Sequence, residues 1–163
     1  DLDEAGISYT LEPEKHGYNV DYVVLSFDRT FHYEKLNRAL QCVKKGSKLI
    51  ATNGDRTCPV EGGEIPDAGG VIGAVEGTSG RKLELIVGKP SPITVEVALE
   101  VLGLKPSQCL MVGDRVETDI LMGHNFGLDT ALVMTGVTDT ETLKSWDIKP
   151  TYVLESVAHI RTK

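Results

Sequence analysis

Short apolar runs alternate with longer amphipathic segments along most of the chain, as they do in proteins whose strands alternate with helices. In one such segment Leu36, Ala39, Leu40 and Val43 recur at helical spacing, and Gly46 follows as a stop signal. We expect strands at 7–11, 22–27, 48–52, 83–87, 109–112, 130–134 and 152–154, and helices at 33–45, 67–77, 92–102, 116–126, 140–145 and 155–161. This alternation predicts an α/β fold with a doubly wound parallel sheet.

A polar, glycine-containing stretch at 78–82 divides the chain into two predicted domains, residues 1–84 and residues 85–163. In the first, the segment 53–66 contains three glycines and two prolines, which indicates a long functional loop at the end of a strand. The helix predicted after this loop carries glycines that we expect to form a close-packing face, namely Gly69, Gly70, Gly73 and Gly77.

Composition narrows the classes of partner. The net charge of −7 and the pI of about 5.1 argue against a nucleic-acid or anionic-membrane partner. No apolar run approaches the roughly 20 residues of a membrane-spanning helix. The three cysteines, Cys42, Cys58 and Cys109, lack Cys-x-x-Cys spacing, which favours free thiols in a reducing compartment. We therefore predict a cytoplasmic protein.

An acidic motif follows the predicted strand 109–112. That strand stops at Gly113 and is followed directly by Asp114, and Asp119 comes five residues later in the first turn of a predicted helix. Carboxylates at the carboxyl end of a parallel strand suit Mg²⁺, which takes one or two of them together with waters and a substrate phosphate. Lys89 follows another predicted strand end and would add positive charge for that phosphate. Each residue also has a structural alternative: Lys89 could be a solvated surface lysine, and Asp119 could be an acidic residue that stabilises the start of the helix through the helix dipole.

These motifs resemble a known enzyme family. Gly-Lys-Pro at 88–90 and Val-Gly-Asp-Arg-x-x-Thr-Asp-Ile at 112–120 resemble the third and fourth motifs of haloacid-dehalogenase-type (HAD) phosphatases. The segments 23–36, 50–57 and 131–137 resemble the subgroup with a large α/β (C2-type) cap. That subgroup holds NagD-like, 4-nitrophenyl phosphatase-like and arabinose-operon sugar phosphatases, and the last look closest. The resemblance implies an α/β cap at 1–84 and the C-terminal half of a HAD-like core at 85–163.

The resemblance also implies roles for individual residues. Asp114 would bind Mg²⁺, Lys89 would neutralise the nucleophile and the phosphoryl oxygens, and Asp119 would support the metal site or orient Lys89. The reaction would be hydrolysis of a small phosphomonoester, such as a sugar phosphate, through an aspartyl-phosphate. Five residues of the cap loop would recognise the leaving group: Asn53, Asp55, Arg56, Thr57 and Cys58. Caps of this kind often form homodimers. Asn53 and Asp55 have an alternative role as caps of the turn.

One part of the family pattern is missing. Members carry an Asp-x-Asp nucleophile pair at the end of the first strand, whereas Asp1 and Asp3 here have no strand before them and Glu-Ala after them. We therefore expect the nucleophile-bearing N-terminal segment to be absent, this chain to be inactive alone, and a sheet edge to be exposed. The alternative is a non-catalytic small-molecule- or protein-binding module that retains the HAD fold; the sequence upstream of Asp1 would distinguish the two.

Overall fold

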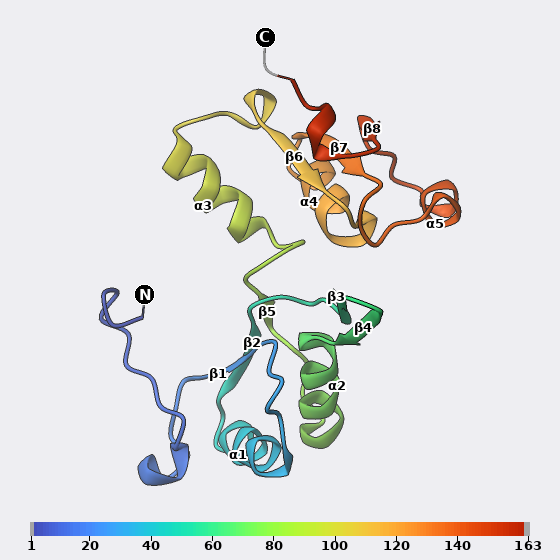
Figure 1. The fold of residues 1–163 in the computed structure, drawn as a ribbon. Coiled ribbons are helices and arrows are strands. Elements are labelled where there is room, and N and C mark those ends of the chain that lie inside the picture. The colour runs from blue at the N-terminus through green and yellow to red at the C-terminus, as the bar shows by residue number, and fades with distance from the viewer. Residues whose placement is uncertain (1, 162–163) are drawn as a thin grey trace. The chain divides into compact units, whose positions relative to one another are not determined.

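The computed structural model describes residues 2–161, which form two compact units that divide between Leu85 and Ile86 (Figure 1). The elements before this division are the 3₁₀ turn Pro13–His16, β1 (Tyr22–Leu25), α1 (Tyr33–Lys44), β2 (Lys48–Ala51), β3 (Thr57–Val60), β4 (Gly63–Pro66) and α2 (Ala68–Ser79). Strand β5 (Leu85–Ile86) crosses it. The elements after it are α3 (Pro92–Leu102), β6 (Leu110–Gly113), the π-helical turn Val116–Ile120, α4 (Leu121–Asn125), β7 (Asp129–Val133), α5 (Thr140–Ser145), β8 (Tyr152–Leu154) and two further 3₁₀ turns, Pro106–Gln108 and Val157–His159.

A three-stranded sheet in the order β1-β2-β5 forms the centre of the first unit. Strands β1 and β2 are parallel, with Val23 opposite Leu49, and α1 connects them. Leu49 is fully buried, and α1 buries Ala39 and Cys42. The helical face predicted from the spacing of apolar residues is therefore the face that α1 buries.

The long loop predicted at 53–66 is only partly a loop. Its second half is an antiparallel hairpin of β3 and β4, in which Thr57 pairs with Pro66 and Val60 with Gly63. Gly62 at the tip has a φ of +84°, which glycine adopts without strain. The hairpin was missed because β3 is short and contains a proline, which is tolerated on an edge strand.

The second unit contains a separate parallel sheet in the order β6-β7-β8. Val112 of β6 lies opposite Ala131 of β7, and Leu132 of β7 lies opposite Val153 of β8. The core beside this sheet is built on three fully buried residues, with partly buried side chains packed around them: Val116, Ile120 and Leu132, then Met134, Leu143, Trp146 and Ile148. Parallel strands connected by helices agree with the predicted architecture.

Several predicted elements differ from the structure. Residues 7–11 form no strand, and the helix expected at 155–161 is only the short turn Val157–His159. Among the glycines of α2, Gly69 approaches another segment closely, since a Cβ there would lie 3.0 Å from the carbonyl oxygen of Asp55. Nothing lies within 4 Å of a Cβ built on Gly73 or Gly77. The close-packing face is therefore limited to the first turn of the helix.

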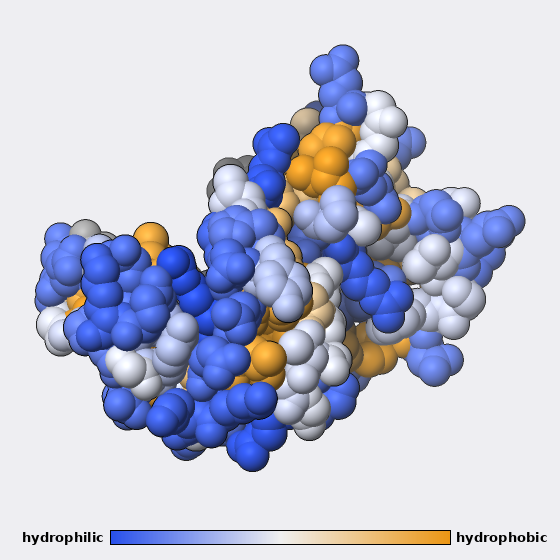
Figure 2. Space-filling view, turned by 90° about the horizontal axis from the view of Figure 1, so that it is seen from below, coloured by the Kyte–Doolittle hydropathy of each residue, from blue (hydrophilic) through white to orange (hydrophobic). Residues whose placement is uncertain are grey.

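Apolar side chains remain exposed on the second unit. Val97, Val101 and Leu102 on α3 are exposed, Val101 to 81%, and so is Leu110 on β6, which is an edge strand of its sheet as described. Figure 2 shows apolar side chains among the hydrophilic ones on the face that it presents. Among the described residues, no helix has the length and apolar character needed to cross a membrane.

Candidate active site

The turn after β6 brings two carboxylates together. Strand β6 ends at Gly113, so that Asp114 leaves the sheet at its carboxyl end and Asp119 lies in the π-helical turn that follows. Oδ2 of Asp119 accepts hydrogen bonds from the backbone N–H groups of Asp114 (3.2 Å) and Arg115 (3.1 Å). The Asp119 side chain is only 2% exposed. Asp119 therefore holds the turn that carries Asp114.

Lys89 joins the same cluster from 30 residues upstream. Its Nζ lies 2.6 Å from Oδ1 of Asp119, and the lysine side chain is 42% exposed. Lys89 lies just before α3, whose N-cap is Ser91. Both carboxylate oxygens of Asp119 are therefore hydrogen-bonded, Oδ1 to Lys89 and Oδ2 to the backbone N–H groups of Asp114 and Arg115. Asp119 is built to hold its neighbours, whereas the ammonium of Lys89 is accessible to an anionic ligand.

Asp114 is held by the loop after β7. Its Oδ2 accepts a hydrogen bond from the N–H of Val137 (3.0 Å), and its carbonyl oxygen accepts one from the N–H of Thr138 (3.1 Å). Toward the described residues, Oδ1 of Asp114 makes no hydrogen bond. Asp114 as a whole is partly exposed, and a carboxylate of this kind suits a hard cation such as Mg²⁺.

Asp114 has no cluster of further protein ligands for a metal ion around it in the described part of the chain. Within residues 2–161, no group of three or more His, Cys, Asp or Glu side chains is arranged to hold a metal ion. An Mg²⁺ site needs no such group, because the ion usually keeps several waters and takes one or two carboxylates together with substrate phosphate. Asp114 therefore fits the role of a single carboxylate ligand.

Two glycines make room for these carboxylates. A Cβ on Gly113 would overlap the side chain of Asp119, and a Cβ on Gly136 would overlap the carboxylate of Asp114. The contacts from the loop at 136–138 were not assigned from the sequence. The available signal was Thr-Gly-Val-Thr directly after a predicted strand, because neighbouring parallel strands end at the same edge of a sheet.

The predicted substrate-binding residues lie together in the first unit. Asn53 donates hydrogen bonds through Nδ2 to Asp67, the N-cap of α2, at 3.0 Å and to Asp55 at 3.2 Å. The carbonyl of Asp55 accepts a hydrogen bond from the N–H of Gly69 (2.8 Å). Asn53 and Asp55 therefore have a structural role as the link between β2 and α2.

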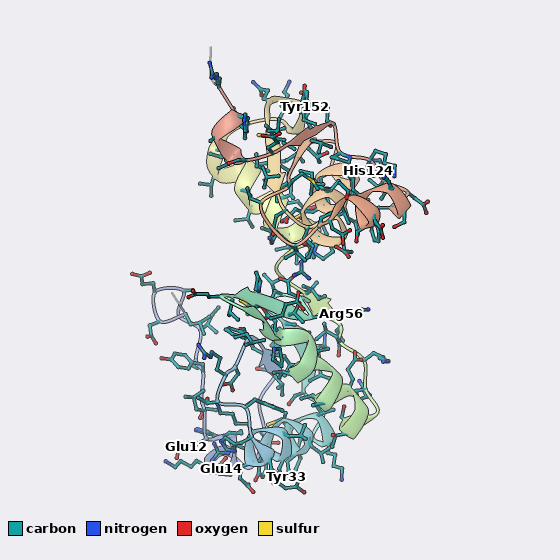
Figure 3. The ribbon with its side chains drawn as sticks, turned by 45° about the vertical axis from the view of Figure 1, so that its right-hand side comes forward. Glu12, Glu14, Tyr33, Arg56, His124 and Tyr152 are labelled. Atoms are coloured by element: carbon teal, nitrogen blue, oxygen red, sulfur yellow. The ribbon has the colours of Figure 1, made fainter. Side chains whose placement is uncertain are left out.

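Arg56, Thr57 and Cys58 continue from this link into β3. The Arg56 side chain is exposed, and in Figure 3 it lies at the opposite end of the first unit from Glu12, Glu14 and Tyr33. Asp3 lies in a turn with no strand before it, and Asp1 lies outside the described residues. The structure therefore groups Lys89, Asp114 and Asp119 in the second unit and the cap-loop residues in the first.

A second polar cluster follows β1. Oδ2 of Asp28 lies 2.6 Å from Nζ of Lys35, and Oδ1 accepts hydrogen bonds from the N–H (2.8 Å) and the hydroxyl (2.7 Å) of Thr30. The hydrogen bond from Lys35 and those from Thr30 lower the pKa of Asp28 to about 2. This cluster fixes the turn between β1 and α1.

The chain is similar to known proteins along most of its length. The second unit matches the HAD-hydrolase-like family over residues 86–160. The chain is 38% identical over 156 residues to the sugar phosphatase AraL of Bacillus subtilis, covering 96% of this chain and 55% of that protein. It thus spans little more than half the length of this relative.

Two solved structures share the fold. The 4-nitrophenylphosphatase of Thermotoga maritima matches with a TM-score of 0.84 and 40% identity, covering 94% of this chain and 57% of that one. NagD of E. coli matches with a TM-score of 0.82 and 32% identity, covering 98% and 60%. The predicted fold class is therefore confirmed.

Proposed function

We propose that this chain belongs to the HAD-like hydrolases and that the whole protein of which it is part hydrolyses small phosphomonoesters, such as sugar phosphates, with Mg²⁺. The observation that carries the proposal is the cluster in which the accessible ammonium of Lys89 contacts Asp119, while Asp119 also holds the turn that carries Asp114. The Asp114 carboxylate uses Oδ2 toward Val137, and Oδ1 accepts no hydrogen bond from a described residue. The relatives named as sugar and nitrophenyl phosphatases support the same reaction class.

In this proposal residues 1–84 are the cap and residues 85–163 are the C-terminal part of the core. Asp114 would hold Mg²⁺, and the ion when bound would neutralise charge on the phosphoryl group. Lys89 binds phosphoryl oxygens and reduces repulsion between them and an anionic nucleophile. Asp119 holds Lys89 through Oδ1 and the Asp114 turn through Oδ2. The chain thus supplies the electrostatic half of a phosphoryl-transfer site.

We place the nucleophilic aspartate in a part of the whole protein outside these 163 residues. Attack of its carboxylate on phosphorus would form an aspartyl-phosphate and break the bond to the leaving-group oxygen, which a second carboxylic acid would protonate to give the alcohol. Water would then attack the phosphorus, release inorganic phosphate and regenerate the aspartate. The exposed apolar side chains of α3 and the exposed β6 edge support this placement, because in the described residues nothing covers them. Asp3 is an unsuitable nucleophile because it lies in an exposed turn.

The first unit would select the leaving group. Arg56 is exposed and carries a planar, permanently charged group suited to anionic or hydroxyl-rich ligands. Thr57 and Cys58 follow it on β3 and would contact the same ligand. The free thiols of Cys42, Cys58 and Cys109 support a cytoplasmic location.

The test compares the encoded protein in full with the 163-residue chain on 4-nitrophenyl phosphate and a panel of sugar phosphates, with Mg²⁺ or with EDTA. We expect Mg²⁺-dependent turnover by the full protein, loss of at least about 100-fold in kcat/KM for Asp114→Asn, and no turnover by the chain alone. Asp147→Asn is the matched control, since Asp147 is exposed and is not one of the cluster residues. A folded full protein without phosphatase activity would instead favour a binding module, and turnover by the chain alone would place the nucleophile within it.

A further inference from the structure

We propose that Thr138 is a positioning residue that, with the N–H of Val137, fixes the Asp114 carboxylate so that Oδ1 is the oxygen presented to the cation. The inference rests on the proposed function, because it concerns the carboxylate assigned there to Mg²⁺. It adds the loop after β7 to the machinery of the site.

Three hydrogen bonds connect this loop to the turn after β6. The N–H of Val137 donates to Oδ2 of Asp114 at 3.0 Å, and the N–H of Thr138 donates to the Asp114 carbonyl at 3.1 Å. In the reverse direction, the Thr138 hydroxyl accepts a hydrogen bond from the N–H of Val116 at 3.2 Å. Thr138 therefore binds the backbone on both sides of Arg115: its N–H binds the carbonyl of Asp114, and its hydroxyl binds the N–H of Val116.

Burial makes these bonds effective. Thr138 is 3% exposed and Val116 is fully buried, so water does not replace the hydroxyl as a partner for the Val116 N–H. Gly136 lets the loop approach this closely, because a Cβ there would overlap the Asp114 carboxylate. The loop and the carboxylate are thus fitted to each other at van der Waals contact.

Such a fit has a consequence for metal binding. A carboxylate is free to rotate about its terminal torsion, and the bond from Val137 to Oδ2 selects one orientation. Partners that orient a ligating group in this way typically change metal affinity by about 10- to 100-fold when removed. Thr138 follows Val137 directly, so the hydrogen bond to the Thr138 hydroxyl also fixes the position of the Val137 N–H.

The experiment measures metal binding directly on the full encoded protein. Mn²⁺ is the probe, with its free concentration followed by electron paramagnetic resonance and with Mg²⁺ added as competitor. Thr138→Val keeps the shape of the side chain and removes the acceptor, and Thr138→Ser restores the acceptor. We expect Thr138→Val to weaken Mn²⁺ and Mg²⁺ binding at least about tenfold and Thr138→Ser to stay within about threefold of the wild type.

Thr130→Val is the matched control. Thr130 is also 3% exposed, and its hydroxyl also accepts a backbone hydrogen bond, from the N–H of Thr151 at 3.0 Å. It lies opposite Met111, at the other end of the strand pair from Asp114. We expect it to lower thermal stability as Thr138→Val does, with metal affinity unchanged.

The outcomes separate the two proposals. Equal metal affinity in wild type, Thr138→Val and Thr130→Val would overturn the positioning role and leave the phosphatase proposal intact, as would equal weakening by both valine variants. A wild-type protein that binds neither ion and shows no Mg²⁺-dependent turnover would overturn both. If Thr138→Val is not folded by circular dichroism, Gly136→Ala replaces it, with the same loss of affinity expected and an unchanged affinity counting against the role.

Discussion

The ammonium of Lys89 lies 2.6 Å from a carboxylate, that of Asp119, whose own side chain is only 2% exposed. A buried carboxylate is stable only when its oxygens are paired, and Lys89 pairs one of them while two backbone N–H groups pair the other. The ammonium of Lys89 therefore stabilises the turn that contains Asp119, and it also presents its positive charge to solvent. Its structural and chemical roles are separable by substitution.

Replacing Lys89 by methionine tests this separation. Lys89→Met leaves the Asp119 charge buried without its cation, and we expect a loss of about 2 kcal/mol in the free energy of unfolding. Lys89→Met/Asp119→Asn removes the unpaired charge and should recover most of that loss. We expect kcat/KM of the full protein to stay at least about 100-fold below wild type in both variants. The measurements are urea denaturation and steady-state kinetics; recovery of activity along with stability in the double variant would refute a chemical role for Lys89.

The space around Gly113 gives a second prediction. A Cβ there would overlap Asp119, so Gly113→Ala should displace that side chain and destabilise the second unit by about 1–3 kcal/mol. Gly73→Ala is the control, because Gly73 lies inside α2 with nothing within 4 Å of a Cβ, and alanine there should stabilise the helix by up to about 1 kcal/mol. Equal thermal stability of the two variants would contradict the crowding around Gly113.

Arg56 gives a prediction about substrate recognition. Its side chain is exposed, so Arg56→Ala should change stability by less than about 0.5 kcal/mol. In the full protein we expect KM for phosphorylated sugars to rise about tenfold with a smaller change in kcat, since the lost contact is to the leaving group. Arg81→Ala removes another exposed arginine and serves as the control. A kinetic profile for Arg56→Ala that matches the control would remove Arg56 from the site.

The ion pair between Asp28 and Lys35 gives a pH-dependent prediction. The folded-state pKa of Asp28 is lowered to about 2, below the unfolded value near 3.9, so its stabilisation is present above about pH 4 and is lost as the pH falls through 2. Because the two side chains are 29% and 37% exposed, we expect only about 1 kcal/mol.

Lys35→Met should therefore lower the free energy of unfolding at pH 7, and the difference from wild type should shrink between pH 4 and pH 2. Lys44→Met on the same helix is the control, because Lys44 is exposed and makes no ion pair with a described residue. Urea denaturation at several pH values measures both. A difference that stays constant down to pH 2 would show that Lys35 acts by packing alone.

Local sequence determined much of this protein. The apolar spacing in 33–45 and the glycines at 46, 103 and 127 are local signals, and each marked its helix or the end of one. Asp114 and Asp119 follow an apolar run, and from that local signal we predict the carboxylates of a site. The weaker predictions failed where a local signal was absent or misleading. Pro59 concealed a strand that an edge position tolerates, and the glycines at 73 and 77 had no neighbour to pack against.

Only the tertiary structure decided how the site is held. Asp114 and Asp119 are close in sequence, but the contact from Lys89 spans 30 residues, and those from Val137 and Thr138 span more than 20. The contacts from Val137 and Thr138 depend on the parallel strands β6 and β7 ending at one edge of a sheet, whereas Lys89 follows β5 of another sheet. None of these contacts leaves a local pattern in the sequence. The sequence therefore identified the groups that carry charge, while the fold determined which oxygen of Asp114 is held and which is open.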